Sequence, residues 1–177
     1  MSGPSENRHF EARGDDYAKH RLTYLAALAE ALAARCALTD HALDVGCGTG
    51  QLSGLLASQF KRVTATDPSE AQIASATVHL GVTYKTEPVE LIILSDGSVD
   101  LIVAAQAAHW FDLDIFYAQA RRVARPGGIV ALVSYGVPQL AEDGTDLRER
   151  FERFYWHDIH AYWPSGREHV EQGYRTL

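Results

Sequence analysis

The sequence has little basic charge, and this restricts the partners that we expect. Its 177 residues hold 16 Lys and Arg against 23 Asp and Glu, so the formal net charge is -7 at pH 7. An acidic chain gains little from the release of counterions on a nucleic acid, so we expect no broad nucleic-acid binding. The basic residues near the N-terminus, from Arg8 to Arg21, are interrupted by acidic ones.

Cysteine is scarce, and the apolar stretches are short. Two cysteines, Cys36 and Cys47, are too few for a metal cluster or for the disulfide framework of a secreted protein, so we expect no metal site. Charged residues interrupt the apolar stretch 22–36, and the polar residues 1–16 lack the apolar core of a signal peptide. We therefore expect a cytoplasmic protein that does not bind a membrane.

Helical and strand patterns alternate along the first 135 residues. The apolar spacing predicts helices at 15–36, 51–60 and 112–125, and Ser69 can cap a further helix. Short apolar or β-branched runs predict strands at 42–45, 62–66, 82–85, 99–105 and 129–135. The last strand has almost no polar residue, so we expect both of its faces to be covered. This alternation predicts a doubly wound, mostly parallel α/β fold.

A glycine-rich loop follows the first strand and opens a helix. Glycine permits a positive φ and lets a ligand approach the backbone closely, although a tight strand-to-helix turn also needs glycine. A nicotinamide-binding loop would have a third glycine where Gln51 stands. Residues 44–50 read Asp-x-Gly-x-Gly-x-Gly, which resembles the first motif of the class I S-adenosylmethionine methyltransferases.

An aspartate ends the second strand, about twenty residues after the first glycine of the loop, as in dinucleotide-binding folds. In the resemblance, the residue that matches Asp67 binds the cofactor ribose; the alternative is a turn aspartate before Pro68. Val89 and Glu90 resemble the stretch that reaches the adenine, although Pro88 replaces a common aspartate and Glu90 can equally be a solvated acid. The resemblance thus implies a set of cofactor-binding residues: Asp44, Gly46, Cys47, Gly48, Gly50, Asp67, Val89, Glu90 and Gln106.

The run after the fourth strand, AAQAAHWF, resembles a subfamily that includes the trans-aconitate methyltransferases. This resemblance implies that Gln106 borders the cofactor and that His109 and Trp110 line the substrate pocket. It also implies that Tyr17 and Arg21 cover the methyl end of the cofactor. The alternatives are that the aromatic residues simply pack beneath the next helix and that Arg21 is a surface residue.

The chemistry expected of such a site depends on the methyl acceptor. A carboxylate is already ionised at neutral pH, so Arg21 would only orient it. A hydroxyl or an amine would need a base, for which His109 is the candidate. Arg21 and His109 are therefore the two candidate catalytic residues.

The resemblance extends from about Phe10 to Leu177, yet only five of the family's seven strands are recognisable. We expect residues 1–136 to form the cofactor-binding part, and residues 137–177 a helical, aromatic-rich cover of the same domain. The fifth strand would then be an exposed edge, which either a partner chain, as in a homodimer, or the helical tail would cover.

Three functions remain open at this point. The first is methyl transfer from S-adenosylmethionine to a small molecule, such as the carboxylate of an organic acid. The second is a catalytically inactive protein or subunit that binds S-adenosylmethionine. The third, a nicotinamide-dependent oxidoreductase, is disfavoured by the glycine spacing. The absence of Asn/Asp-Pro-Pro-Tyr/Phe and Pro-Cys sequences disfavours nucleobase methylation.

Overall fold

The computed structural model describes residues 24–137, 140, 146–163 and 166–175. The chain divides into two compact units, Met1–Val133 and Ser134–Leu177, and each is described by itself. The boundary lies close to residue 137, where the sequence changes in character. Membership of both parts in one domain stays a prediction.

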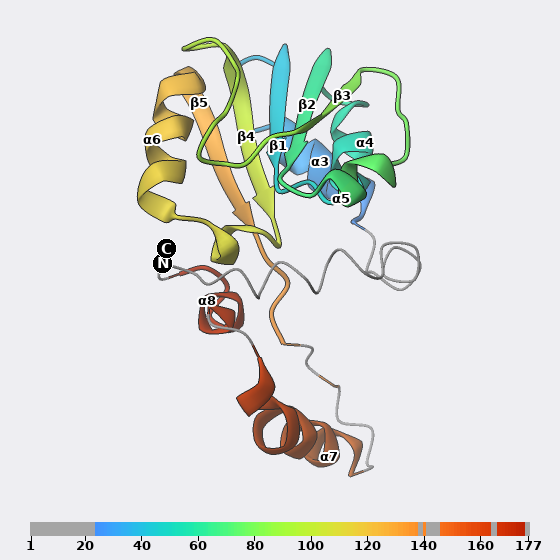
Figure 1. Ribbon diagram of the computed structural model, residues 1–177. Coiled ribbons are helices and arrows are strands. Elements are labelled where there is room, and N and C mark those ends of the chain that lie inside the picture. The colour runs from blue at the N-terminus through green and yellow to red at the C-terminus, as the bar shows by residue number, and fades with distance from the viewer. Residues whose placement is uncertain (1–23, 138–139, 141–145, 164–165, 176–177) are drawn as a thin grey trace. The chain divides into compact units, whose positions relative to one another are not determined.

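The first unit is built on a five-stranded parallel sheet (Figure 1). The strands are β1 His41–Val45, β2 Arg62–Asp67, β3 Val82–Thr86, β4 Val99–Ala105 and β5 Ala124–Val133. Their order is β3-β2-β1-β4-β5, so the direction of winding reverses between β1 and β4. In open sheets of this kind, ligands bind beyond the carboxyl ends of the strands at that point. The predicted fold class is confirmed.

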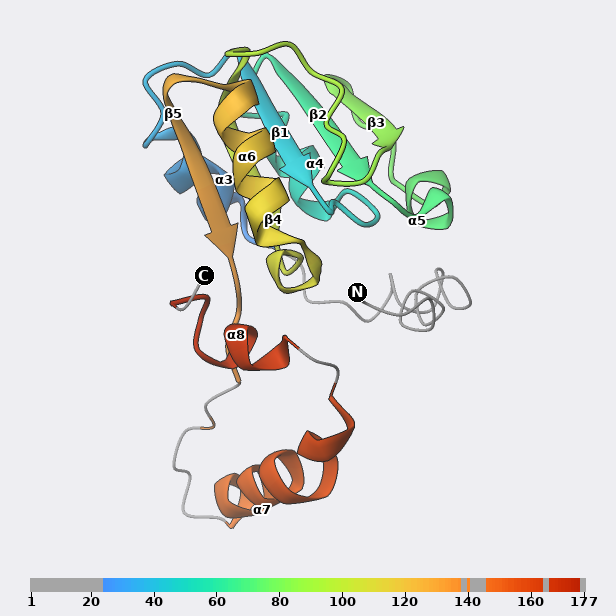
Figure 2. The same cartoon turned by 60° about the vertical axis from the view of Figure 1, so that its left-hand side comes forward.

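Helices follow most of the strands and cover both faces of the sheet (Figure 2). They are α3 Ala26–Ala33, α4 Gln51–Leu56, α5 Glu70–Ala74, the short 3-10 turn Ala108–Trp110 and α6 Leu113–Val123. The side chain of Ser69 caps α5 as predicted, since its hydroxyl accepts a hydrogen bond of 3.3 Å from the amide of Gln72. Asp112 caps α6 in the same way, through the amide of Ile115 at 3.2 Å.

Two apolar cores lie on the two faces of this sheet. Alternate side chains of a strand point to opposite faces, so Ala42 and Leu43 of β1 belong to different cores. The core with Ala42 is closed by α3 and α4, and the core with Leu43 by α6, whose Phe116 is fully buried. The helices thus fix the strand ends that carry the polar residues described below.

The predicted element bounds differ from the structure at several ends. The helix predicted at 51–60 ends at Leu56, and α3 ends at Ala33; residues 15–23 lie outside the described part. The helix predicted to reach Arg125 ends at Val123 because Ala124 already has extended dihedrals and pairs with Val99. Pairing with β4 therefore draws the Pro-Gly-Gly sequence into β5.

The expectation that both faces of the fifth strand are covered was wrong. In the described part of the chain, β5 pairs only with β4, so it forms one edge of the sheet. Its residues are exposed or only partly buried, and 40% of Val130 is exposed.

The second unit contains short helices around an aromatic centre: α7 Leu147–Arg153, a π-helical turn Phe154–Ile159, a 3-10 turn His160–Tyr162 and α8 Arg167–Glu171. Tyr155 is buried there; its hydroxyl donates to Glu171 Oε1 at 2.9 Å and accepts from Arg167 Nη2 at 2.9 Å. The guanidinium of Arg167 stacks on the ring of Trp163, 4.6 Å from its centroid. Several aromatic residues of the tail thus form the packed centre of this unit.

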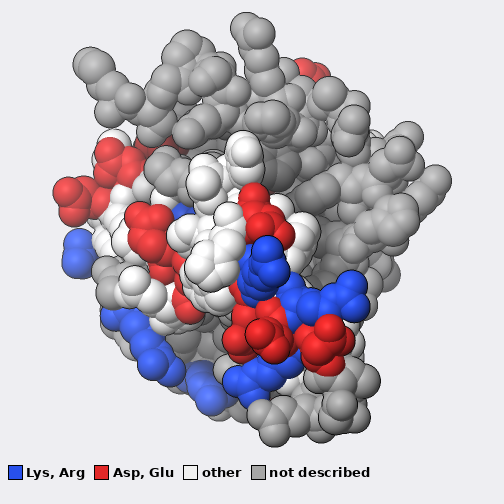
Figure 3. All heavy atoms as spheres, turned by 90° about the horizontal axis from the view of Figure 1, so that it is seen from below, with Lys and Arg blue, Asp and Glu red and all other residues white. Residues whose placement is uncertain are grey.

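Charges of both signs are mixed on the surface drawn in Figure 3, where acidic side chains lie directly beside basic ones. In α7, for example, Arg148 Nε pairs with Glu152 Oε1 at 3.0 Å. No helix in the described part of the chain has the length and apolarity needed to cross a membrane.

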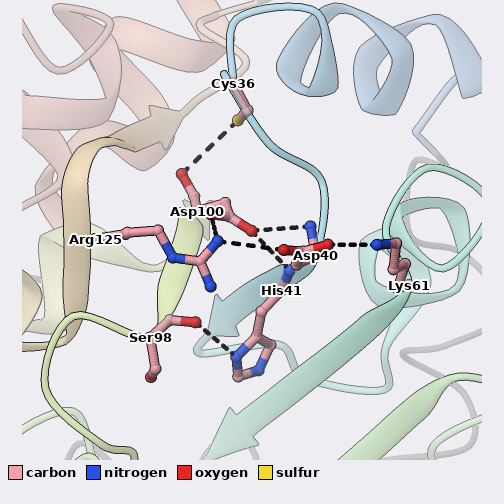
Figure 4. Close-up of polar contacts among 7 residues, drawn as sticks. All are labelled: Cys36, Asp40, His41, Lys61, Ser98, Asp100 and Arg125. Carbon is pink, nitrogen blue, oxygen red and sulfur yellow. Dashed lines mark hydrogen bonds and ion pairs between the residues drawn. The ribbon is translucent and has the colours of Figure 1, made fainter.

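A polar cluster joins three strands at the edge of the sheet opposite the glycine-rich loop (Figure 4). Asp100 is buried, and its Oδ2 accepts hydrogen bonds of 2.9 Å from the amides of Asp40 and His41. Its Oδ1 pairs with Arg125 Nη1 at 2.7 Å, and Asp40 pairs with Lys61 at 2.7 Å. Every buried oxygen of Asp100 thus has a donor, which indicates that the cluster stabilises the fold.

The imidazole of His41 lies beside this cluster and predicts a dependence of stability on pH. The ring is buried, and its nitrogens lie 2.9 Å from Thr64 Oγ1 and 3.3 Å from the carbonyl of Ser98. Burial lowers the pKa of His41, and the nearby charge of Arg62 lowers it further. The unfolded chain therefore binds a proton near pH 6.5, its ordinary pKa, before the folded chain does.

We therefore expect the free energy of unfolding to fall as the pH drops below about 6.5, by at most about 1.4 kcal/mol per pH unit from this group. Urea unfolding measured between pH 8 and pH 5 tests this. The variant His41→Gln should show a smaller dependence, whereas His157→Gln, at an exposed position of the second unit, should behave like the parent. The same dependence in His41→Gln and in the parent would contradict the prediction.

Candidate functional site

The glycine-rich loop, residues 46–50, is tied to the neighbouring strand and needs its glycines. The amides of Gly46 and Cys47 donate to the carbonyl of Thr66 on β2, at 2.8 and 3.0 Å. Gly46, Gly48 and Gly50 have φ values of 68°, 55° and 80°. These values lie in the left-handed region, which residues with a Cβ adopt only at a cost in free energy. The predicted reason for glycine at these positions is confirmed.

Asp67 connects the end of β2 to this loop. Its Oδ2 accepts a hydrogen bond of 2.9 Å from the amide of Gly48, and its Oδ1 accepts one of 2.9 Å from the amide of Ser69. Asp67 therefore makes the local turn and also holds the loop. An ionised carboxylate has about four lone-pair positions, so these two bonds leave acceptor capacity for further donors.

A small pocket lies at the carboxyl ends of β1 and β4, where the winding of the sheet reverses. Its lining comes from the N-terminal segment, β1, the glycine-rich loop, α4 and β4: Tyr24, Asp44, Gly46, Cys47, Gln51, Leu52 and Ala105. Asp44 is buried in its wall, and its Oδ2 accepts a hydrogen bond of 2.6 Å from Ser53 Oγ. A buried carboxylate at this place can attract a cationic group.

Two amide side chains beside this pocket present buried polar atoms that other described residues do not satisfy. They are the acceptor Gln51 Oε1 and the donor Gln106 Nε2. A buried polar atom without a partner loses the hydrogen bond that water would give it, at a cost of about 1–3 kcal/mol. The pair therefore indicates a ligand that offers both a donor and an acceptor.

The backbone of Gln106 is also held in an uncommon conformation. Its φ is 55°, and in the described part of the chain only one other residue that is not glycine, Tyr174, has a positive φ. Its amide donates to the carbonyl of Val133 at 2.8 Å, which joins the ends of β4 and β5. Such strain costs about 1–3 kcal/mol and gathers at functional sites.

His109 and Trp110 lie on the 3-10 turn that follows β4. Their rings contact each other with centroids 4.9 Å apart, and 42% of Trp110 is exposed. Phe111 instead packs against Phe116 of α6, with ring centroids 5.3 Å apart. Trp110 is therefore available to a ligand, whereas Phe111 has a packing role. Tyr17 and Arg21 lie outside the described residues.

The predicted adenine-binding segment follows β3. Val89 is buried in the core against α6, and Glu90 is exposed. The acid that organises this segment is Glu87, which the sequence analysis missed: its Oε2 accepts from the amide of Ile93 at 3.2 Å, and its Oε1 pairs with Lys85 at 3.2 Å. Its position directly after a strand, like that of Asp67, was the signal that could have identified it.

Comparison with known proteins identifies the type of domain. A family model described as a methyltransferase domain matches residues 43–132, which include the glycine-rich loop, Asp67 and His109. A protein of Dictyostelium discoideum, named as a candidate methyltransferase, is 35% identical over 93% of this chain and 63% of its own length. The malonyl-[acyl-carrier protein] O-methyltransferase of Pectobacterium atrosepticum is 33% identical over 62% of this chain and 47% of its own length.

A solved structure shows the same arrangement. A candidate type II methyltransferase from Anaeromyxobacter dehalogenans is 46% identical, with a TM-score of 0.80, and the match covers 89% of this chain and 66% of that one. The chain thus spans about two thirds, or less, of the length of these relatives.

Proposed function

Because the chain belongs to the methyltransferase domain family, we propose that it binds S-adenosylmethionine and transfers the methyl group of this cofactor to a small molecule. Proteins of this family use S-adenosylmethionine as methyl donor. The observation that carries the proposal is the hydrogen bond between Asp67 and the amide of Gly48, which joins the ribose-binding candidate to the glycine-rich loop.

The residues around the pocket suit the parts of this cofactor. The amino-acid end carries an ammonium group and a carboxylate. Asp44 and Gln51 Oε1 match the ammonium, and Gln106 Nε2 matches the carboxylate. Asp67 would accept the ribose hydroxyls, and Val89 with Glu90 would border the adenine. The unpartnered amide atoms of Gln51 and Gln106 support this assignment, because each gains the partner that it lacks.

The chemical step requires little beyond alignment. When bound, S-adenosylmethionine supplies an electrophilic methyl group on a positively charged sulfur. The residues after β4, His109 and Trp110, would hold the acceptor in line with that methyl, and such positioning accounts for much of the rate gain in a displacement. Tyr17 and Arg21 remain the proposed cover of the methyl end, with Arg21 orienting a carboxylate through its planar guanidinium.

We propose the carboxylate of an organic acid as the acceptor. A carboxylic acid has a reference pKa of about 4, so it is ionised at neutral pH and needs no base. The resemblance to the trans-aconitate methyltransferase subfamily supports this class of acceptor. The name of the Pectobacterium relative, which describes O-methylation of a malonyl group, supports it as well. For a hydroxyl or amine acceptor, His109 would be the base.

A second candidate is a protein that binds S-adenosylmethionine without transferring its methyl group. The observation behind it is the exposed edge of β5, which a partner chain, such as a second copy, would cover. We place the protein in the cytoplasm in either case.

Methyl transfer to acids separates the two candidates. The protein is incubated with S-adenosylmethionine labelled in the methyl group and with a panel of mono-, di- and tricarboxylic acids. The first proposal expects a labelled product that alkali releases as methanol, as a methyl ester would. Saturable cofactor binding without transfer to any acid, alcohol or amine would favour the second candidate.

A further inference from the structure

Tyr84 projects from the edge strand β3 onto the glycine-rich loop. A Cβ atom built on Gly50 would lie 2.6 Å from Cε1 and 2.8 Å from Cζ of Tyr84, so the phenol ring lies directly against Gly50. Tyr84 pairs with Ala65 in the register of β2 and β3, which fixes its backbone in the sheet. The side chain thus connects a rigid strand to the loop.

The hydroxyl of Tyr84 adds a second connection to the loop. It donates a hydrogen bond of 2.9 Å to the carbonyl of Thr77, and the amide of Thr77 donates to the carbonyl of Thr49 at 3.4 Å. Thr77 belongs to the segment that leads from α5 to β3. On the same segment, the ring of His79 lies against Gly54 of α4, since a Cβ there would be 2.7 Å from its Cδ2.

The two halves of the loop are held differently. The first half, Gly46 to Gly48, is bonded to β2 through the carbonyl of Thr66 and the carboxylate of Asp67. The second half, Thr49 and Gly50, has Tyr84 and Thr77 as its contacts in the described part of the chain that come from β3 and from the segment before it. Removal of the Tyr84 ring would leave this half without lateral support.

The electrostatic surroundings keep the phenol in its donating form. Burial raises the pKa of Tyr84 to about 12, and the proximity of Cys47 and Asp44 raises it further. The hydroxyl is therefore protonated at every physiological pH, and its hydrogen bond to Thr77 persists.

From this geometry we propose that Tyr84 is a positioning residue, which holds Thr49 and Gly50 in the conformation that binds the cofactor. The inference rests on the proposed function, because the loop matters only if a ligand binds there. Tyr84 itself acts through Gly50 and Thr77. The contact also excludes any residue with a Cβ at position 50, in addition to the constraint from its φ of 80°.

Three variants test the proposal: Tyr84→Leu removes the ring, Tyr84→Phe removes only the hydroxyl, and Tyr117→Phe removes the hydroxyl of a partly buried tyrosine on α6. Calorimetric titration with S-adenosylmethionine gives the affinity. We expect Tyr84→Leu to weaken binding about tenfold and Tyr84→Phe about threefold, which are the effects of one or two net contacts. Tyr117→Phe should bind like the parent.

Hydrogen exchange of the ligand-free protein separates positioning from a general loss of stability. In Tyr84→Leu the amides of residues 49–54 should exchange faster, while those of β1 and β4 keep their protection. Affinity within twofold of the parent in Tyr84→Leu, or equally faster exchange in β1 and β4, would overturn the proposal. If the parent itself fails to bind, the proposed function fails, and hydrogen exchange still tests whether Tyr84 holds the loop.

Discussion

We expect Gly46→Ala to abolish measurable binding of S-adenosylmethionine and to lower the free energy of unfolding by about 2–5 kcal/mol. The φ of Gly46 is 68°, where a residue with a Cβ costs about 1–2 kcal/mol. The added Cβ would also lie only 2.6 Å from the Cβ of Ala107. Relief of such an overlap by shifts of the surroundings costs about 1–3 kcal/mol more.

A matched control separates these two costs. Gly97 has a φ of 60° but no heavy atom within 4 Å of an added Cβ, so Gly97→Ala should lose only the backbone contribution and should bind the cofactor normally. In the double variant Gly46→Ala, Ala107→Gly, part of the lost stability should return. Calorimetry and urea unfolding give both quantities. Equal losses of stability in Gly46→Ala and Gly97→Ala would show that the contact with Ala107 is not limiting.

The second large effect is expected at Asp67. Asp67→Ala should weaken binding of S-adenosylmethionine by about 1–3 kcal/mol, the scale for the loss of hydrogen bonds to a charged group. Part of this loss comes from the loop, because the amide of Gly48 loses its acceptor. Asp112→Ala is the matched control, since Asp112 also accepts a hydrogen bond from a backbone amide, that of Ile115, but at the start of α6. Unchanged affinity in Asp67→Ala would remove Asp67 from the site.

The fold followed from the sequence wherever a local pattern and the tertiary structure agree. The strand at 99–105 has the predicted bounds, and Ser69 caps its helix, because apolar runs and capping residues act within a few residues. The start of β5 could not be predicted. Pro126 and Gly128 favour a turn locally, whereas pairing with β4 extends the strand through them.

The candidate site was predictable in its motif but not in its supports. The glycines and Asp67 were identified because their spacing is short and regular. Tyr84 and Glu87 were missed, since their roles depend on a contact with a loop distant in sequence and on a segment that folds back. The strained φ of Gln106 has no local cause in its residue type either. The roles of Tyr17 and Arg21 stay predictions.

The central claim is that this loop and Asp67 bind S-adenosylmethionine. Calorimetric titration of the whole chain with S-adenosylmethionine, S-adenosylhomocysteine and NAD tests it most directly. We expect saturable binding at one site for the first two compounds and none for NAD, because Gln51 stands where a nicotinamide-binding loop has its third glycine. Binding of NAD, or the absence of binding by both adenosyl compounds, would contradict the account.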